Sequence, residues 1–231
     1  MRKITCITLA MVLLVYVMAV SANIACAAEE IKVGDIIPFG AHDWRVLEIQ
    51  DGKALLLSDR VIGRRAYSGS NAEVTWETCS LRRYLNGEFY DSFSAEEKAR
   101  IAETRLTNDD NPWYGTSGGN ETSDRIFLLS LEEVVKYFGD SGDLKSRKGW
   151  YWENGPVLKD GQGYFINDQY NSARIARAAN DEASGWWLRS PGVDSFDAVT
   201  VFYSGYVYVS GHYDGIHRSN GGVRPALWLN L

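Results

Sequence analysis

The histidines are the first residues whose chemistry the sequence raises. His212 and His217 lie close together on a glycine-rich turn, with Asp214 between them, and His42 is the third histidine of the chain. Such a pair could bind a metal ion or act as acid and base, because imidazole titrates near neutral pH. A polar loop beyond a hairpin is the more ordinary interpretation, and we favour it. His212 and Asp214 are therefore candidates for contacting a ligand, and no metal or cofactor is expected.

Two loops carry acidic residues. Asp194 and Asp197 follow Pro191, and residues 109–111 read Asp-Asp-Asn. Solvated acidic loops are commoner than ion sites, so we expect Asp194 and Asp197 to contact a ligand without holding a metal. A carboxylate pair for glycoside hydrolysis stays open as an alternative, although none of the 30 acidic residues stands out as one of a pair. No nucleophile elbow, phosphate loop or dinucleotide fingerprint is present, so no catalytic residue is predicted.

Aromatic side chains offer a second route to binding, because exposed rings stack on sugars and anchor protein interfaces. The chain contains 8 Trp and 13 Tyr. Those in expected loops are Trp113, Tyr114, Trp150, Tyr151, Trp152 and Tyr213. For Trp113 and Tyr114 the sequence leaves binding and burial equally open, and Trp152 is also kept as a ligand-binding candidate. A core position is expected for Trp44, Trp76, Trp187 and Trp228.

Two arginines interrupt apolar segments. We expect Arg189 and Arg224 to be buried and paired with acids such as Glu77, Asp124 or Asp197, which would make them determinants of the fold. A cleft lined by both arginines would instead attract a carboxylate or a sugar acid. Arg189 is therefore also kept as a ligand-binding candidate, and Arg224 is expected to be structural.

Residues 1–28 have the pattern of a secretory signal peptide. Arg2 and Lys3 precede the apolar run 4–20, and small residues follow it. A retained membrane anchor is the alternative, but the run is short and no basic stop follows it. Lipid attachment at Cys26 is a further alternative. The prediction is export, to the medium or the cell surface, with the membrane reached only through such a lipid.

Cleavage after residue 28 would change both charge and cysteine content. Two of the 24 basic residues leave and all 30 acidic residues stay, so the net charge goes from −6 to −8. That balance argues against binding nucleic acid or an anionic membrane. Cys6 and Cys26 also leave, so no intrachain disulfide can form. Cys79, in a predicted helix, is expected to be a small buried side chain and no nucleophile.

The elements that position these residues run from strands through helices back to strands. Residues 31–58 predict a β-meander, with turns at Gly40 and Asp51-Gly52. Further strands are predicted at 61–67, 103–107 and 126–129. Helices are predicted at 78–86, 95–102, 131–138 and 172–179, the second and third beginning at capping boxes and the last exposing Arg174 and Arg177.

A hairpin closes the pattern. Residues 198–203 and 206–210 are rich in β-branched and aromatic residues, and Ser204-Gly205 joins them. Both faces are apolar, so the hairpin is expected inside a sheet, flanked by strands that contain Trp187 and Trp228. The order of elements, without a repeat or a linker, predicts an α+β fold: one domain over residues 31–231 with antiparallel sheets and a few short helices.

Four motifs carry a family resemblance. They are Thr-Trp-Glu-Thr-Cys-Ser-Leu-Arg at 75–82, Ile-Phe-Leu-Leu-Ser at 126–130, Trp-Trp-Leu-Arg-Ser-Pro-Gly at 186–192 and Gly-Val-Arg-Pro-Ala-Leu-Trp-Leu at 222–229. The chain resembles a domain of unknown function found in secreted and surface proteins of Gram-positive bacteria, over nearly all of residues 31–231. That resemblance implies no activity.

The stretch from Gly185 onward also resembles the C-type-lectin-like fold, a group that includes formylglycine-generating enzymes. The resemblance implies a core sheet made of the Trp-rich strand, the hairpin and the final strand. Formylglycine formation needs two reactive cysteines, and only Cys79 remains after cleavage. The Glu-Pro-Asn and Trp-Asn-Asp motifs of calcium-dependent lectins are also absent.

These observations together predict a non-catalytic binding module, secreted or displayed on the cell surface. Its ligand, a glycan or a protein, is expected to meet the loops 108–123, 139–163 and 192–197. The alternatives from other classes are a secreted hydrolase acting on glycans and a structural component of a cell-envelope assembly.

Overall fold

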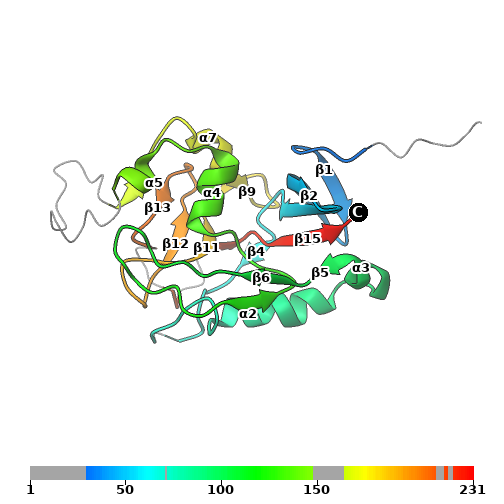
Figure 1. Ribbon diagram of the computed structural model, residues 1–231, viewed down its shortest axis with the longest axis horizontal. Coiled ribbons are helices and arrows are strands. Elements are labelled where there is room, and N and C mark those ends of the chain that lie inside the picture. The colour runs from blue at the N-terminus through cyan, green and yellow to red at the C-terminus, as the bar shows by residue number, and fades with distance from the viewer. Residues whose placement is uncertain (1–29, 71, 148–163, 212–215, 218–220) are drawn as a thin grey trace, which may run out of the picture. The chain divides into compact units, whose positions relative to one another are not determined.

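The computed structural model describes residues 30–70, 72–147, 164–211, 216–217 and 221–231 (Figure 1). The helices and strands given below all belong to the unit Lys32–Leu231. The predicted signal peptide and Cys26 fall outside the described residues. In the described part of the chain, no helix is long and apolar enough to cross a membrane.

The first sheet has five antiparallel strands in the order β1-β2-β3-β15-β5. Its strands are β1 (Ile36–Phe39), β2 (His42–Gln50), β3 (Lys53–Ser58), β15 (Ala226–Asn230) and β5 (Ile101–Ala102). The predicted meander is confirmed, and Asp51 and Gly52 form its second turn with positive φ angles of 51° and 70°. All five residues of β15 pair with β3, with Leu227 opposite Leu56, and β15 so lies between β3 and β5 (Figure 1).

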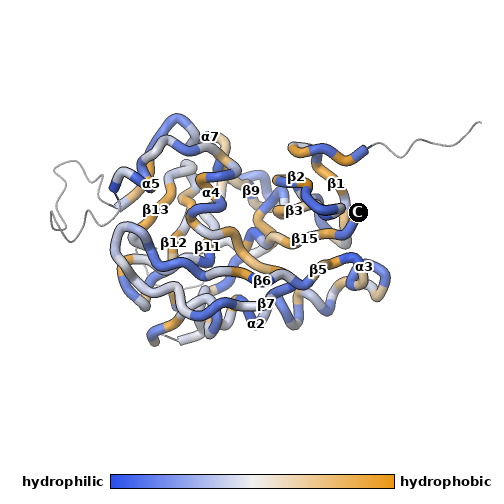
Figure 2. Tube along the Cα trace, in the orientation of Figure 1, coloured by the Kyte–Doolittle hydropathy of each residue, from blue (hydrophilic) through white to orange (hydrophobic). Residues whose placement is uncertain are grey.

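The second sheet has six strands in the order β4-β14-β11-β12-β13-β8. They are β4 (Gly63–Arg64), β14 (Gly222–Val223), β11 (Trp186–Pro191), β12 (Ala198–Val201), β13 (Val207–Tyr208) and β8 (Phe165–Ile166). The predicted hairpin is β12–β13, and it lies inside this sheet as expected. All residues of β11 and β12 are buried. Hydrophobic residues are concentrated along β3, β12 and β15 (Figure 2).

The remaining elements are short. Two strand pairs are β6 (Thr104–Leu106) with β7 (Thr122–Asp124), and β9 (Ala176–Arg177) with β10 (Ala183–Ser184). The helices are α2 (Ser80–Tyr84), η1 (Leu85–Phe89), α3 (Ala95–Arg100), α4 (Leu131–Phe138), α5 (Asp143–Ser146) and α7 (Asn171–Arg174). Both predicted capping boxes are present, at Ser94 with Glu97 and at Ser130 with Glu133. The fold is therefore α+β, with two main sheets and a few short helices.

The helix expected to end at Asn86-Gly87 continues instead as the π-helix η1. Asn86 is held by tertiary contacts: its Nδ2 donates to the Ile126 carbonyl at 2.8 Å, and its Oδ1 accepts from the Arg125 N–H at 2.8 Å. Leu85 and Phe89 are buried in the same turn. Burial and these bonds outweigh the weak helix propensity of Asn-Gly.

Four other expectations about elements are wrong. Residues 126–129 are buried but form only an isolated bridge, between Phe127 and Ala226. The Leu129 carbonyl instead accepts a hydrogen bond from the Arg189 N–H of β11. The predicted strand 61–67 is only the two-residue strand β4. The final strand, β15, belongs to the first sheet and does not flank the hairpin. The last predicted helix is only α7, and Arg174 at its end is fully buried, bound to Asp168 through both terminal nitrogens at 2.8 and 3.0 Å.

One buried carboxylate ties three segments of this core together. Asp124, in β7, has a fully buried side chain that accepts from the Trp76 indole at 2.9 Å, the Arg82 Nε at 2.7 Å and the Thr122 hydroxyl at 2.8 Å. Asp124 therefore pairs with Arg82, while the arginines expected to use it find other partners.

Replacing Asp124 by Ala is expected to lower the free energy of unfolding by about 3–5 kcal/mol, because Arg82 and the Trp76 indole would lose their partner. Urea unfolding measures the change. The matched control is Asp91→Ala, whose exposed ion pair with Lys98 is worth less than about 1 kcal/mol. Equal effects of the two substitutions would contradict this role of Asp124.

Candidate functional site

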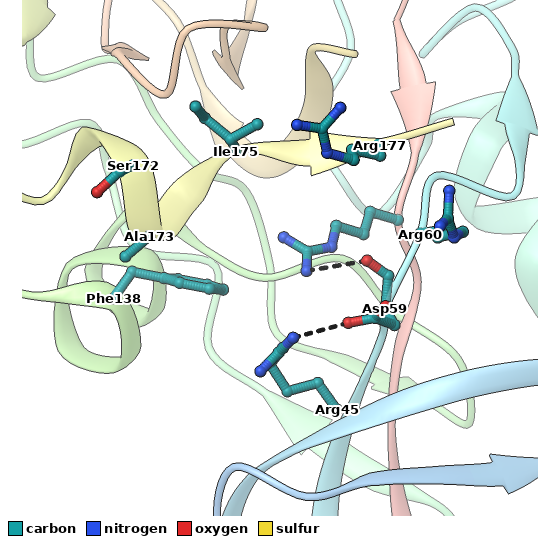
Figure 3. A pocket seen from close by; sticks show the side chains of 9 residues that line it. Arg45, Asp59, Arg60, Phe138, Ser172, Ala173, Ile175 and Arg177 are labelled. Atoms are coloured by element: carbon teal, nitrogen blue, oxygen red, sulfur yellow. Dashed lines mark hydrogen bonds and ion pairs between the residues drawn. The ribbon is translucent and has the colours of Figure 1, made fainter. Parts of the chain in front are cut away.

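A cavity of about 460 Å³ lies where the first sheet meets α4, α7 and β9. Its polar lining comes from Arg45, Asp59, Arg60, Arg177 and Arg224, and its other lining from Phe138, Ser172, Ala173 and Ile175. Figure 3 shows the labelled arginines and Asp59 on one side, and Phe138, Ser172 and Ala173 on the other. We call this cavity the arginine pocket.

Neighbouring strands bring the arginines together. Arg45 projects from β2 and pairs with Asp59, just after β3, at 2.9 Å. Arg224 lies between β14 and β15, and its Nε donates to the Ser58 carbonyl at the end of β3 at 2.9 Å. Its Nη2 reaches the Asp59 carbonyl at 3.4 Å. The pairing of β15 with β3 therefore places Arg224 beside the Arg45–Asp59 pair.

Arg224 is a buried cation whose hydrogen bonding is incomplete. Its side chain is almost wholly shielded, and its Nη1 has no hydrogen-bond partner among the described residues. The guanidinium lies over the rings of Trp186 and Phe138, at 5.0 and 5.6 Å from their centroids. Burial lowers the pKa of Arg224 to about 10, while Asp59 raises it and Arg45 lowers it further. Arg224 is thus charged at neutral pH, and an unpaired N–H on a buried charge is costly unless an anion meets it.

The local charge is positive in an acidic chain. Arg60 donates to Asp181 at 3.0 Å and Arg177 to the Asp181 carbonyl at 2.6 Å, so one further carboxylate lies beside the pocket. Four arginines against two aspartates leave an excess of positive charge where the whole chain carries −6. Guanidinium groups bind carboxylates through paired hydrogen bonds, so the pocket is suited to a carboxylate ligand.

The lining does not offer the groups that hydrolysis needs. Asp59 is the one carboxylate among the nine described residues that line the pocket, and it is held by Arg45. Glycoside hydrolysis uses two carboxyl groups on either side of the bond. In the part of the chain that the structure describes, no group of three or more His, Cys, Asp or Glu could hold a metal ion. The described lining of the pocket therefore holds a single carboxylate, which is already paired.

Arg189 lies outside the arginine pocket. It is buried, as expected, but its partner is Glu133, with Nη2 to Oε1 at 3.1 Å, and its Nη1 also donates to the Leu128 carbonyl at 2.8 Å. Of the acids expected as partners, Asp124 pairs with Arg82, and none of them forms an ion pair with Arg189 among the described residues. Arg189 thus joins β11 to the start of α4, and it does not share with Arg224 the pocket that the described residues form.

Trp113 and Tyr114 are buried, each 2 % exposed, so neither ring is presented to a ligand on the surface. Asn111 fixes their loop, because its Oδ1 accepts from the N–H groups of both residues and its Nδ2 donates to the carbonyls of Pro191 and Val209. The alternative of burial therefore describes these two aromatics. The loop 108–123 is organised by a buried amide, which its polar sequence does not reveal.

Asp194 and Asp197 lie together in the loop after β11. Asp194 is exposed and accepts from the Phe196 N–H at 2.8 Å. Asp197 is half-buried, and burial, with a smaller contribution from Asp194, raises its pKa from 3.8 to about 6. Neither residue lines the arginine pocket. The other candidates of this region, Trp152, His212 and Asp214, lie outside the described residues, as do Trp150, Tyr151 and Tyr213.

The residues expected to be structural divide into two groups. Trp76 and Trp187 are buried with their indole N–H groups bonded to Asp124 and to the Arg65 carbonyl. Trp228 is only half-buried, so its expected core position is wrong. Arg224 is buried, but with no acid in direct contact among the described residues. The position of Arg224 in an apolar segment was the one feature of the sequence that pointed to the pocket. The other arginines of the pocket are scattered along the chain.

Cys79 is buried at the start of α2, where its sulfur accepts from the Arg82 N–H at 3.3 Å. Burial, only partly offset by hydrogen bonds and by Arg82, raises the pKa of its thiol to about 12. The residue caps a helix and is not activated as a nucleophile.

The fold and the pocket define an α+β domain with a buried arginine at a cavity that four arginines line. A family model matches residues 51–231, and its description is "Domain of unknown function (DUF6273)". The chain therefore belongs to this family. The match includes every pocket residue except Arg45, which lies before it. No curated protein and no solved structure matches the chain.

The thiol of Cys79 is expected to react with iodoacetamide at pH 8 about a thousandfold more slowly in the folded protein than in urea, because the reactive thiolate is scarce at so high a pKa. Peptide mass spectrometry at Cys79 measures this rate separately from Cys6 and Cys26. Equal rates in both states would contradict the buried capping role.

Asp197→Asn is expected to stabilise the protein by about 1 kcal/mol at pH 7, after allowance for solvent screening. The raised pKa means that the folded state holds the proton more tightly than the unfolded state, so stability falls as pH rises from about 4 to about 6. Because Asn does not ionise, the Asp197→Asn variant does not lose this stability as the pH rises. Urea unfolding at pH 7 and below pH 4 measures the change, which should vanish at the lower pH. A gain of the same size at both values would mean that charge is not its cause.

Proposed function

We propose that this protein is a non-catalytic binding module that takes a carboxylate-bearing ligand, a sugar acid of a glycan, into the arginine pocket. The observation that carries the proposal is Arg224. It is a buried guanidinium with one terminal nitrogen unpaired among the described residues, and it lines a cavity that is open to a ligand. That nitrogen is shielded from solvent in the ligand-free fold, so a ligand carboxylate would satisfy it after a small movement of the neighbouring side chains.

The rest of the lining supports an acid on a carbon ring. Arg45 and Arg60 reinforce the positive field, and both are partly exposed, so they can adjust to a ligand. The Ser172 hydroxyl can donate to or accept from a sugar hydroxyl. Phe138 and Ile175 supply apolar surface for the faces of the ring. A volume of about 460 Å³ is within the range of small-molecule sites.

Export and lectin-like architecture are parts of the same proposal. The basic start and apolar run of residues 1–28 support secretion or surface display, with a lipid at Cys26 as the membrane-linked variant. The C-type-lectin-like fold rests on the sequence resemblance from Gly185 onward. A ligand at the cell surface, either an acidic glycan or the acidic group of a protein, suits a module in that location.

Isothermal titration calorimetry tests the proposal with glucuronate, galacturonate and N-acetylneuraminate, each beside its neutral counterpart or parent sugar. We expect at least one acid to bind and the neutral sugars not to compete for the pocket. Arg224→Met should weaken binding by about tenfold or more, because a charge-assisted hydrogen bond is lost. Higher salt should weaken it too.

The matched control is Arg83→Met, which removes an exposed arginine of α2 and should leave binding unchanged. Arg45→Gln, at a partly exposed position, keeps the test valid if Arg224→Met folds poorly. Failure of all three sugar acids to bind would overturn the proposal for sugars. Equal binding of succinate or a peptide carboxylate would move the proposal to a protein ligand.

A further inference from the structure

Trp228 differs from every other tryptophan that the structure describes. Trp44, Trp76, Trp113, Trp186 and Trp187 are each no more than 2 % exposed, and each donates its indole N–H to a carbonyl or a carboxylate. Trp228 is half-buried, and its indole N–H donates no hydrogen bond to a described residue. The fold therefore leaves one indole accessible while it satisfies the other five.

Trp228 lies in the middle of the first sheet. On β15 it is opposite Leu55 of β3 on one side and Ala102 of β5 on the other. It lines a shallow groove of about 280 Å³, whose other residues come from the β2–β3 turn and from the chain around β6. These six residues are Gln50, Asp51, Lys53, Glu103, Thr104 and Arg105. We call this the Trp228 groove.

The charges of the Trp228 groove cancel, in contrast to those of the arginine pocket. Asp51 and Glu103 balance Lys53 and Arg105. Glu103 is paired with Arg125 at 3.1 Å, and Arg105 is paired with Glu121, so both are already engaged. The groove thus offers no net attraction for an ion of either sign.

The uncharged polar groups of the groove are free to bind. Gln50 brings an amide and Thr104 a hydroxyl, and neither side chain makes a hydrogen bond with another described residue. Each group both donates and accepts. Together with the Trp228 side chain they line one groove, and their hydrogen-bonding groups suit the hydroxyls of a sugar.

We propose that the Trp228 groove is a second binding site, which takes a pyranose of a neutral glycan stacked on the Trp228 indole. An aromatic face bordered by amide, hydroxyl and charged side chains matches the two surfaces of a pyranose, apolar on its C–H face and polar at its edge. The shallow shape leaves room for a chain to continue beyond one ring. The site is separate from the arginine pocket and does not depend on it, because no residue lines both.

Nuclear magnetic resonance of protein labelled with ¹⁵N-tryptophan tests this directly. The chain has 8 Trp, so the indole region holds one signal for each, and Trp228→Phe identifies its signal by removing it. Neutral oligosaccharides of glucose, xylose, mannose, galactose and N-acetylglucosamine are titrated up to about 50 mM, well above a millimolar dissociation constant. At least one should shift the Trp228 signal saturably.

Two variants give the result its meaning. Trp228→Ala has no Trp228 signal, so its binding is measured by titration calorimetry, where it should be at least tenfold weaker; the remaining indole signals should stay unchanged as proof of folding. Phe202→Ala, at an exposed aromatic of the hairpin between β12 and β13, is the matched control and should bind normally. Gln50→Ala should also weaken binding, and it leaves the hydrophobic core unchanged because Gln50 is exposed. This variant keeps the test valid if Trp228→Ala folds poorly.

The outcomes separate the two proposed sites. Arg224→Met should leave the Trp228 shifts intact, so loss of sugar-acid binding and loss of neutral-sugar binding are independent results. No shift of the Trp228 signal with any of the five sugar series would overturn the inference. A shift confined to another indole, or binding that Phe202→Ala removes and Trp228→Ala does not, would overturn it too.

Discussion

The pairing of β15 with β3 is the constraint on which the rest of this structure depends. Five consecutive residues of β15 face five of β3, from Ala226 opposite Leu57 to Asn230 opposite Lys53. The same register places Arg224 against the carbonyl at the end of β3 and Trp228 opposite Leu55. Since a slip of one residue would turn every side chain to the other face, the two proposed sites share one geometric origin.

The three buried arginines show how the fold treats charge. Arg174 is bound through both terminal nitrogens to Asp168, and Arg189 likewise to Glu133, so each buried cation has its own carboxylate. Arg224 has two backbone carbonyls, two aromatic rings and no direct acid among the described residues. Buried ion pairs stabilise a fold only when both partners are satisfied. Arg224 is thus the one of these three arginines without a carboxylate partner, although each of the three keeps one guanidinium nitrogen without a hydrogen-bond partner among the described residues.

The sequence predicts local features well and tertiary partners poorly. The meander of β1 to β3, the hairpin of β12 and β13 and the helix α4 follow from periodicity, turn residues and capping boxes, which act over a few neighbours. The π-helix at Asn86 and the place of β15 depend on contacts with distant segments, so no local pattern contains them.

The sites divide in the same way. Arg224 was noticed because it interrupts an apolar stretch, but its neighbours Arg45 and Arg177 come from distant parts of the chain. Nothing in their local sequence connects them. For Trp113 the sequence left binding and burial equally open because its loop is polar, and the structure shows that the buried amide of Asn111 organises that loop from within. Exposure is a property of the folded surface, and composition describes it only on average.

The place of β15 also has a consequence for how the domain is made. Strand β3 gains its second neighbour only from residues that a ribosome adds nearly the whole domain later. Until then, β3 and β5 present unpaired edges, which are prone to wrong pairing. Joining segments so far apart in sequence also slows folding, because a long loop must close first. The first sheet is therefore the last part to be completed, and in a chain still in synthesis the position between β3 and β5 stays empty.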